Sequence, residues 1–150
     1  MNMRQPTVYE VATSDTDLIR FVGELLGETK SHQPEHFHEE GRHARKNERC
    51  YACRWSEYAI YRVDQWLNPR FPHDGTERYV VVSNGMTTVP GERIFRRVDA
   101  TSSPTEVVEL LTTRKYGQPP MITSTAAKLL ARVSDLDEKI QEAWDNRVVL

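Results

Sequence analysis

Cysteine is scarce in this chain of 150 residues, and long apolar runs are missing. The two cysteines, Cys50 and Cys53, are too few for the multi-bridge framework of small secreted domains. The longest apolar runs, such as Val80-Val81-Val82, fall far below the roughly 18 residues that span a bilayer, and the first residues lack the apolar core of a signal peptide. The sequence therefore predicts an intracellular, cytoplasmic protein with no membrane partner.

Catalytic fingerprints are missing as well. The chain contains no G-x-S-x-G elbow, no P-loop and no dinucleotide-binding glycine pattern. Isolated acidic pairs such as Glu39-Glu40 are typical of solvated surface charge. We therefore expect no catalytic residues and no organic cofactor.

What the chain does contain is the composition of an ordinary globular domain. Hydrophobic residues make up 38% and charged residues 28%, which argues against disorder. A chain of this length buries roughly two thirds of its unfolded surface, so one core is sufficient. We expect residues 1–150 to form a single α+β domain.

The first half of the chain predicts a strand, a helix and a polar loop. Thr7–Ala12 alternates like a strand, and Ser14 with Asp17 resembles a capping box that opens a helix ending at Gly27. The apolar side chains on one face of this N-terminal helix are Leu18, Ile19, Phe21, Val22, Leu25 and Leu26. Residues 28–53 follow as a His/Cys-rich loop, too polar to order itself by burying side chains.

Strand and turn signals dominate the middle of the chain. The run from Trp55 to Val63 is aromatic and β-branched with apolar groups on both faces, which predicts a central strand. Asn84-Gly85 predicts a hairpin between strands over Arg78–Ser83 and Met86–Val89, and Pro90-Gly91 predicts a turn into a strand over Glu92–Ala100. Together these segments predict an antiparallel meander.

Helical signals fill residues 104–146. Ser103-Pro104-Thr105-Glu106 supplies an N-cap, a proline at the first helical position and an acidic third residue, for a helix to about Lys115. From Ser124 apolar residues recur at helical spacing, with a recapping signal at Ser134-Asp135-Leu136-Asp137, so we expect one long helix or two abutting ones. The predicted fold is an antiparallel sheet packed by N-terminal and C-terminal helices, with a zinc knuckle.

The zinc knuckle is predicted from Cys50-Tyr51-Ala52-Cys53 and the histidines before it. Two thiolates separated by two residues can point at one tetrahedral ion, and His43 lies five residues after His38, within the spacing of structural zinc sites. We predict a structural Zn²⁺ held by Cys50, Cys53, His43 and His38, with His36 as the alternate for His38. The competing interpretation is a pair of core cysteines beside a solvated histidine-rich loop.

Two families of zinc enzymes resemble this stretch in part. His38-Glu39-Glu40 before Cys50-x-x-Cys53 resembles the nucleobase deaminase signature, but only nine residues separate Glu40 from Cys50, and Arg49 stands where that family has proline. Asn47 before the cysteines resembles HNH nucleases, but a strand is predicted where their helix would begin. A zinc-dependent nuclease or hydrolase, with Glu39 or Glu40 as base, remains the least favoured alternative.

Positive charge is concentrated around the cysteines, whereas the C-terminal stretch is acidic. The basic residues of the 42–54 segment are Arg42, Arg45, Lys46, Arg49 and Arg54, against Glu48 alone. In the alternative of a nucleic-acid-binding protein, these residues would contact phosphates, with Trp55 or Tyr51 available to stack on a base. Packing in the core is the competing interpretation for Trp55, and a solvated charge run is the competing interpretation for the basic residues.

Three motifs together resemble small uncharacterised actinobacteriophage proteins. They are Arg49-Cys50-x-Ala52-Cys53-Arg54-Trp55-x-Glu57, Val89-Pro90-Gly91-Glu92 and the helix start Ser103-Pro104-x-Glu106-Val107-Val108-Glu109-Leu110-Leu111. The resemblance covers most of the chain from His43 onward and implies a viral protein acting in a bacterial cytoplasm. It transfers no activity. We therefore expect a zinc-stabilised phage accessory protein that binds and modulates a host protein, with nucleic-acid binding as the alternative.

Overall fold

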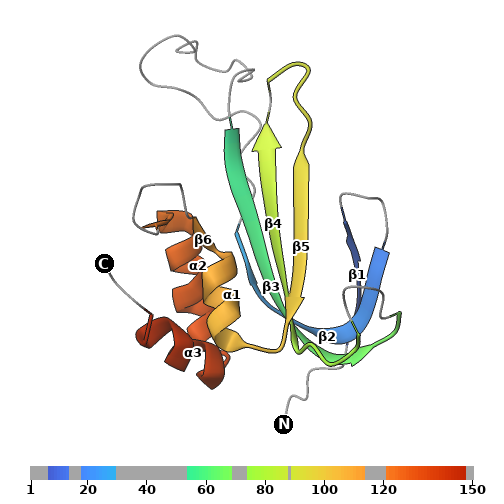
Figure 1. The fold of residues 1–150 in the computed structure, drawn as a ribbon, viewed down its shortest axis with the longest axis vertical. Coiled ribbons are helices and arrows are strands. Elements are labelled where there is room, and N and C mark those ends of the chain that lie inside the picture. The colour runs from blue at the N-terminus through green and yellow to red at the C-terminus, as the bar shows by residue number, and fades with distance from the viewer. Residues whose placement is uncertain are drawn as a thin grey trace.

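The computed structural model describes residues 7–13, 18–29, 54–68, 74–87, 89–113 and 121–147, which form an α+β fold (Figure 1). The main sheet contains β1 (Thr7–Ala12), β2 (Leu18–Glu28), β3 (Arg54–Trp66), β4 (Tyr79–Thr87) and β5 (Phe95–Thr101). A two-stranded sheet of β6 (Thr112–Thr113) and β7 (Met121–Ile122) lies among helices α1 (Pro104–Leu110), α2 (Ser124–Ser134) and α3 (Glu138–Asp145). Each strand of the main sheet pairs antiparallel with the next along the chain, which confirms the predicted class and meander.

The predicted N-terminal helix is wrong, because Leu18–Glu28 forms strand β2. Its apolar residues occur at helical spacing, but β2 lies between two strands and contributes to the cores on both sides of the sheet. Ile19 and Phe21 belong to one core cluster, whereas Leu26 belongs to the other. Two register shifts, at Val22/Gly23 and Leu25/Gly27, bend the strand. A bent strand that turns apolar side chains first to one core and then to the other thus produces the same apolar pattern as an amphipathic helix.

The predicted hairpin at Asn84-Gly85 is also wrong. β4 continues through both residues, with Asn84 paired to Glu57 of β3 and to Arg96 of β5. The turn forms at Pro90-Gly91 instead, where Gly91 has a φ of 87° and the N–H of Glu92 donates to the carbonyl oxygen of Val89 at 3.1 Å. Pairing with a strand on each side thus overrides the local turn preference of Asn84-Gly85.

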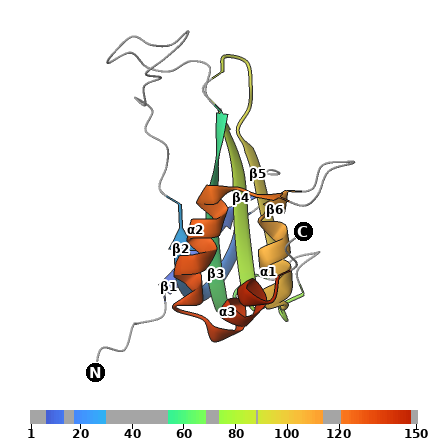
Figure 2. The same ribbon diagram turned by 90° about the vertical axis from the view of Figure 1, so that its left-hand side faces the viewer.

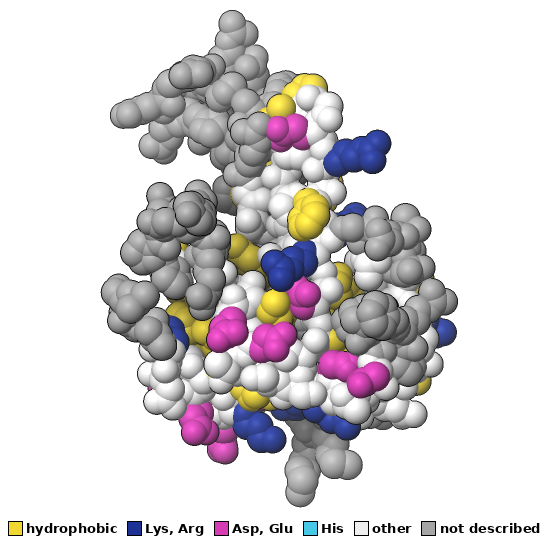
Figure 3. Space-filling model, in the orientation of Figure 1, with side chains coloured by type: hydrophobic (Ala, Val, Ile, Leu, Met, Phe, Trp, Pro, Cys, Tyr) yellow, Lys and Arg dark blue, Asp and Glu magenta, His cyan; other side chains and the backbone are white. Residues whose placement is uncertain are grey.

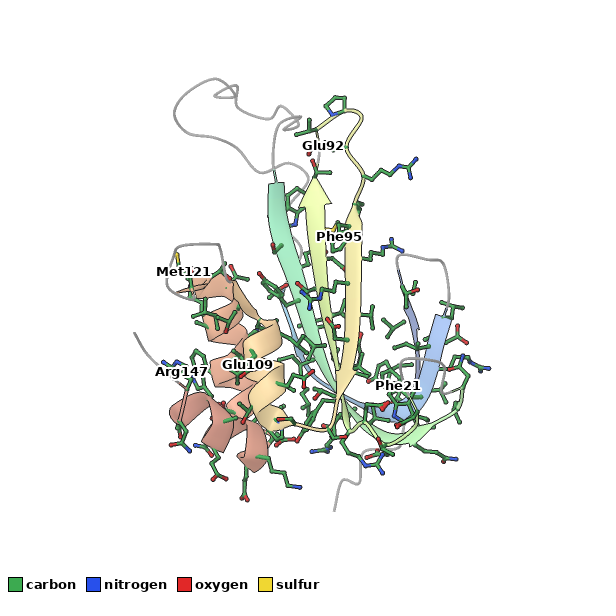
Figure 4. All side chains as sticks on the ribbon, in the orientation of Figure 1. Phe21, Glu92, Phe95, Glu109, Met121 and Arg147 are labelled. Carbon is green, nitrogen blue, oxygen red and sulfur yellow. The ribbon has the colours of Figure 1, made fainter. Side chains whose placement is uncertain are left out.

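The sheet has a helix face and an inner face. Figure 2 shows the helices covering the lower part of β3, β4 and β5. α2 packs so closely on β2 that a Cβ at Gly27 would lie 2.9 Å from side-chain atoms of Leu129 and Val133. On the inner face the sheet curls until β1 contacts β5, and a ring cluster fills the curl: Tyr9, Phe21 (Figure 4), Tyr61 and Trp66.

The C-terminal helices follow their predicted caps. Ser103 Oγ accepts from the N–H of Glu106 at 3.3 Å, but α1 ends at Leu110, short of Lys115, because Thr112-Thr113 enters β6. For the residues after Ser124 we expected one long helix or two abutting ones, and the structure has two, α2 and α3. The carboxylate of Asp137 caps α3.

Candidate functional site

The residues of the predicted zinc knuckle lie outside the part of the chain that the structure describes: Cys50, Cys53, His43, His38 and His36. Arg42, Arg45, Lys46 and Arg49 of the predicted nucleic-acid surface lie outside it too. Among the described residues, no group of three or more His, Cys, Asp or Glu side chains is placed to hold a metal ion. Strand β3 begins at Arg54, and the indole of Trp55 is half-buried.

The described structure fixes where the 30–53 segment is attached. Thr29 and Tyr58 are joined by two hydrogen bonds of 2.9 Å, one from the N–H of Thr29 to the carbonyl oxygen of Tyr58 and one from the N–H of Tyr58 to Thr29 Oγ1. Arg54 opens the neighbouring strand only four residues earlier. Both ends of the segment therefore leave the sheet from the same end as the β4–β5 turn.

We call this end the tip and define it as residues 54–57, 83–87 and 89–97. The ladder between β2 and β3 ends at Glu28 opposite Ala59, so within the described residues Arg54–Glu57 pair with β4 alone. The helices pack lower, and the three strands project beyond them (Figure 2). Hydrophobic, basic and acidic side chains are mixed on the described surface of this projection (Figure 3).

A groove of about 520 Å³ lies at the tip. Its lining residues come from all three strands and the turn: Trp55, Ser56, Gly85, Met86, Thr87, Glu92, Arg93 and Phe95. Gly85 pairs with Ser56 on one side and Phe95 on the other, so the side chains of these two flank it on the helix face. A Cβ at Gly85 would meet only the Cβ of Phe95, at 3.6 Å, so the glycine leaves an open floor.

The β4–β5 turn is held by polar contacts, while its apolar side chains face solvent. Thr87 Oγ1 donates to a carboxylate oxygen of Glu92 at 2.8 Å and accepts from the N–H of Val89 at 3.0 Å. Ile94 is 45% exposed and Phe95 63% exposed. Figure 4 shows Glu92 in the turn and Phe95 at the start of β5. The turn therefore presents two large apolar side chains on a braced backbone.

The inner face of the tip carries Trp55 and an unsatisfied amide. Trp55 lies opposite Met86, and its Nε1–H donates to Glu57 Oε1 at 3.4 Å. Asn84 Oδ1 is buried without a hydrogen-bond partner among the described residues, a condition that costs free energy unless another group satisfies it. Trp55 is thus neither wholly in the core nor free of contacts.

A second groove, of about 530 Å³, lies between the sheet and the start of α3. Here Tyr79 Oη donates to Asp137 Oδ2 at 3.0 Å, and the Arg62 guanidinium approaches the same oxygen at 4.0 Å while bonding Glu24 at 2.6 Å. Burial, followed by the hydrogen bond to Asp137, raises the pKa of Tyr79 to about 12. Asp137 accepts hydrogen bonds from Tyr79 in β4 and from the first backbone N–H groups of α3, so this network joins the helix to the sheet.

Sequence reasoning identified some of these features and missed others. The sequence pointed to Trp55 as a residue that could stack on a base, and to Asp137 as part of the signal for a new helix start. For Ile94 and Phe95 the sequence predicts only that they belong to a strand over Glu92–Ala100. Their exposure depends on where β2 and the helices end, which no local signal reveals.

Comparisons of the chain with family models, with curated proteins and with solved structures find no match. The resemblance to actinobacteriophage proteins remains a prediction. No helix among the described residues is long and apolar enough to cross a membrane.

Proposed function

We propose that this protein is a small phage accessory protein that binds and modulates a host protein in the bacterial cytoplasm, and that the tip is its binding surface. The observation that supports this proposal is the exposure of Phe95 and Ile94 beside a groove, on a part of the sheet that no described helix covers. The two side chains are adjacent in sequence, and contiguous exposed apolar groups beside a groove are typical of surfaces that bind a partner.

The composition of the tip favours a protein partner. Interface cores are enriched in aromatic residues, methionine and arginine, and the energetic anchors are most often Trp, Tyr and Arg. The tip carries Trp55 and Met86 on its inner face and Phe95 on its helix face, with Arg93 between the turn and β5. Strands that are hydrogen-bonded to each other present these side chains in a fixed arrangement, which lowers the entropy cost of binding.

Zinc has a structural role in this proposal. Cys53 immediately precedes Arg54, the first residue of β3, so a metal bound to Cys50 and Cys53 would lie close to the tip by covalent connection alone. With His43 and His38 as the other ligands, and His36 as the alternate, the ion would shorten the free length of the 28–53 loop. A closed shell of four protein ligands leaves no open position for catalysis.

Nucleic-acid binding is the second candidate. Arg93 and Arg96 are exposed at the tip, and the basic 42–54 segment enters the sheet there through Arg54. Phosphate contacts by these residues, with Trp55 available for stacking, would give an affinity that falls steeply with salt. Failure to bind short DNA and RNA at low salt would eliminate this candidate.

Affinity capture from host lysate tests the proposed surface, with a matched control. Phe95→Ser removes the exposed side chain at the tip, whereas Met121→Ser alters a residue of nearly equal exposure, 62%, beside α2 and away from the tip (Figure 4). The host partner should be captured by the native protein and by Met121→Ser, and lost with Phe95→Ser. Equal capture by all three proteins would mean that the tip is not the binding surface.

Metal analysis tests the predicted zinc knuckle separately. The purified protein should carry about one zinc ion, and Cys50→Ser should lose most of it together with partner capture. A native protein holding less than about half an equivalent of zinc would refute the structural-zinc proposal.

A further inference from the structure

We infer that the partner contributes an extended, acidic segment, which pairs with the outer edge of β5 and places an apolar side chain in the tip groove. This inference rests on the proposed function and specifies how the partner is recognised.

The first support is the edge of β5. Among the described residues, β5 hydrogen-bonds to β4 on one side and to no strand on the other; β1 contacts it without forming a ladder. Phe95, Arg96 and Arg97 are all exposed. An edge strand with outward N–H and C=O groups is a template for an added strand, in which main-chain hydrogen bonds supply affinity and alternate side chains supply specificity.

The second support is the register of side chains along that edge. Phe95 and Arg97 lie on the helix face, because they pair with Gly85 and Ser83, while Arg96 lies on the inner face opposite Asn84. An added strand would alternate in the same way. Its residues on the helix face would meet Phe95 and the open floor at Gly85, and its residues on the inner face would meet Arg96.

The third support is local charge. Residues 92–97 contain three arginines against one acid, Glu92, in a chain whose net charge is −2. Asp99 follows directly and pairs with Arg97 at 2.7 Å, so residues 92–99 keep three arginines against two acids and a net positive charge. Opposite charges directly across two strands stabilise pairing and like charges oppose it, so an acidic segment fits this edge.

Charge also disfavours a second copy of this chain as the occupant. Antiparallel pairing of β5 with its own copy would bring Arg96 and Arg97 of one chain near those of the other. Such like-charge contacts are one of the ways in which natural edge strands avoid pairing with themselves. The occupant is therefore a different chain with complementary charge.

The test uses a synthetic seven-residue peptide, Glu-Val-Glu-Phe-Glu-Val-Glu with blocked ends, titrated into the full-length protein. The same peptide with lysine in place of glutamate should bind at least about tenfold more weakly. Of two versions N-methylated on alternate amides, the one whose methyl groups face β5 should lose binding, because it cannot donate to the edge.

Gly85→Val provides the test from the protein side. The valine would fill the groove floor in a strand that has room for its Cβ, so the fold should be retained while peptide affinity falls at least about tenfold. Met121→Ser should bind as the native protein does.

Three results would overturn the inference: no binding of the acidic peptide, equal binding of the lysine peptide, or equal binding by Gly85→Val. Binding of single-stranded oligothymidylate that is lost with Phe95→Ser would assign the surface to nucleic acid and overturn it as well. If lysate capture depends on Phe95 while the peptide fails to bind, the edge inference is wrong and the proposed function stands. If capture ignores Phe95, the proposed function itself is wrong.

Discussion

The same three strands form two regions of opposite character. The base is defined as residues 58–66, 79–82 and 98–101. There Ile60 and Val81 are buried beneath the helices, and Val80 is buried in the cluster on the inner face. In the tip, Ile94 and Phe95 face solvent. The difference arises from the neighbours, because β2, α1 and α2 cover the base and stop short of the tip.

This contrast separates folding from binding. Full burial of a large aliphatic or aromatic side chain is worth about 1.5–3 kcal/mol, whereas an exposed one contributes little. The base therefore supplies the free energy of unfolding. The tip keeps apolar side chains that folding does not require, and changes there should affect binding without affecting stability.

The largest expected contrast comes from truncating one side chain in each region. Leu129→Ala, in the fully buried face of α2, should lower the free energy of unfolding by about 2–5 kcal/mol, because it leaves a cavity between helix and sheet. Phe95→Ala should change it by less than about 0.5 kcal/mol. Urea denaturation followed by circular dichroism measures both, and comparable losses would erase the distinction between base and tip.

A pair of glycines sharpens the comparison. A Cβ at Gly23 would run into the carbonyl oxygen of Arg62, so Gly23→Ala should force β2 and β3 apart and cost about 1–3 kcal/mol. Gly85→Ala places its methyl group in open space and should be neutral or slightly stabilising. Thermal melts of the two variants provide the measurement. A Gly23→Ala protein as stable as the native one would contradict the close approach of the two strands.

The smallest of these effects concerns the Tyr79–Asp137 bond at the foot of the base. Tyr79→Phe should cost about 0.5–1.5 kcal/mol at neutral pH, since it removes one buried hydrogen bond. The folded pKa of about 12 exceeds the ordinary 10.0, so this stabilisation is fully present below pH 10 and declines as the pH rises through 12. The free energy of unfolding, measured by denaturation at several pH values between 9 and about 12, should therefore fall more steeply with pH for the native protein than for Tyr79→Phe. Identical slopes would contradict the raised pKa.

Features encoded within a few residues were predictable. The strand at Thr7–Ala12, the turn at Pro90-Gly91 and the cap at Ser103 all formed where the sequence indicated. Each depends on a backbone preference or a hydrogen bond between near neighbours, so the rest of the fold has little influence on it.

Features set by distant partners were not predictable. Leu18–Glu28 is a strand because β1 and β3 flank it, and Asn84-Gly85 stays extended because β3 and β5 pair with it. The bond between Tyr79 and Asp137 joins residues 58 apart in sequence. The exposure of Phe95 likewise depends on where β2 and the helices end, so no local signal predicts it.

The central claim is that the tip binds the partner protein while the buried base supplies the stability of the fold. Its most direct test measures, for the native protein, Phe95→Ser and Met121→Ser, both the free energy of unfolding and the amount of host protein captured. We predict three equal free energies within about 0.5 kcal/mol, with capture lost for Phe95→Ser alone. Capture that is unchanged in Phe95→Ser, or lost only in step with stability, would contradict the claim.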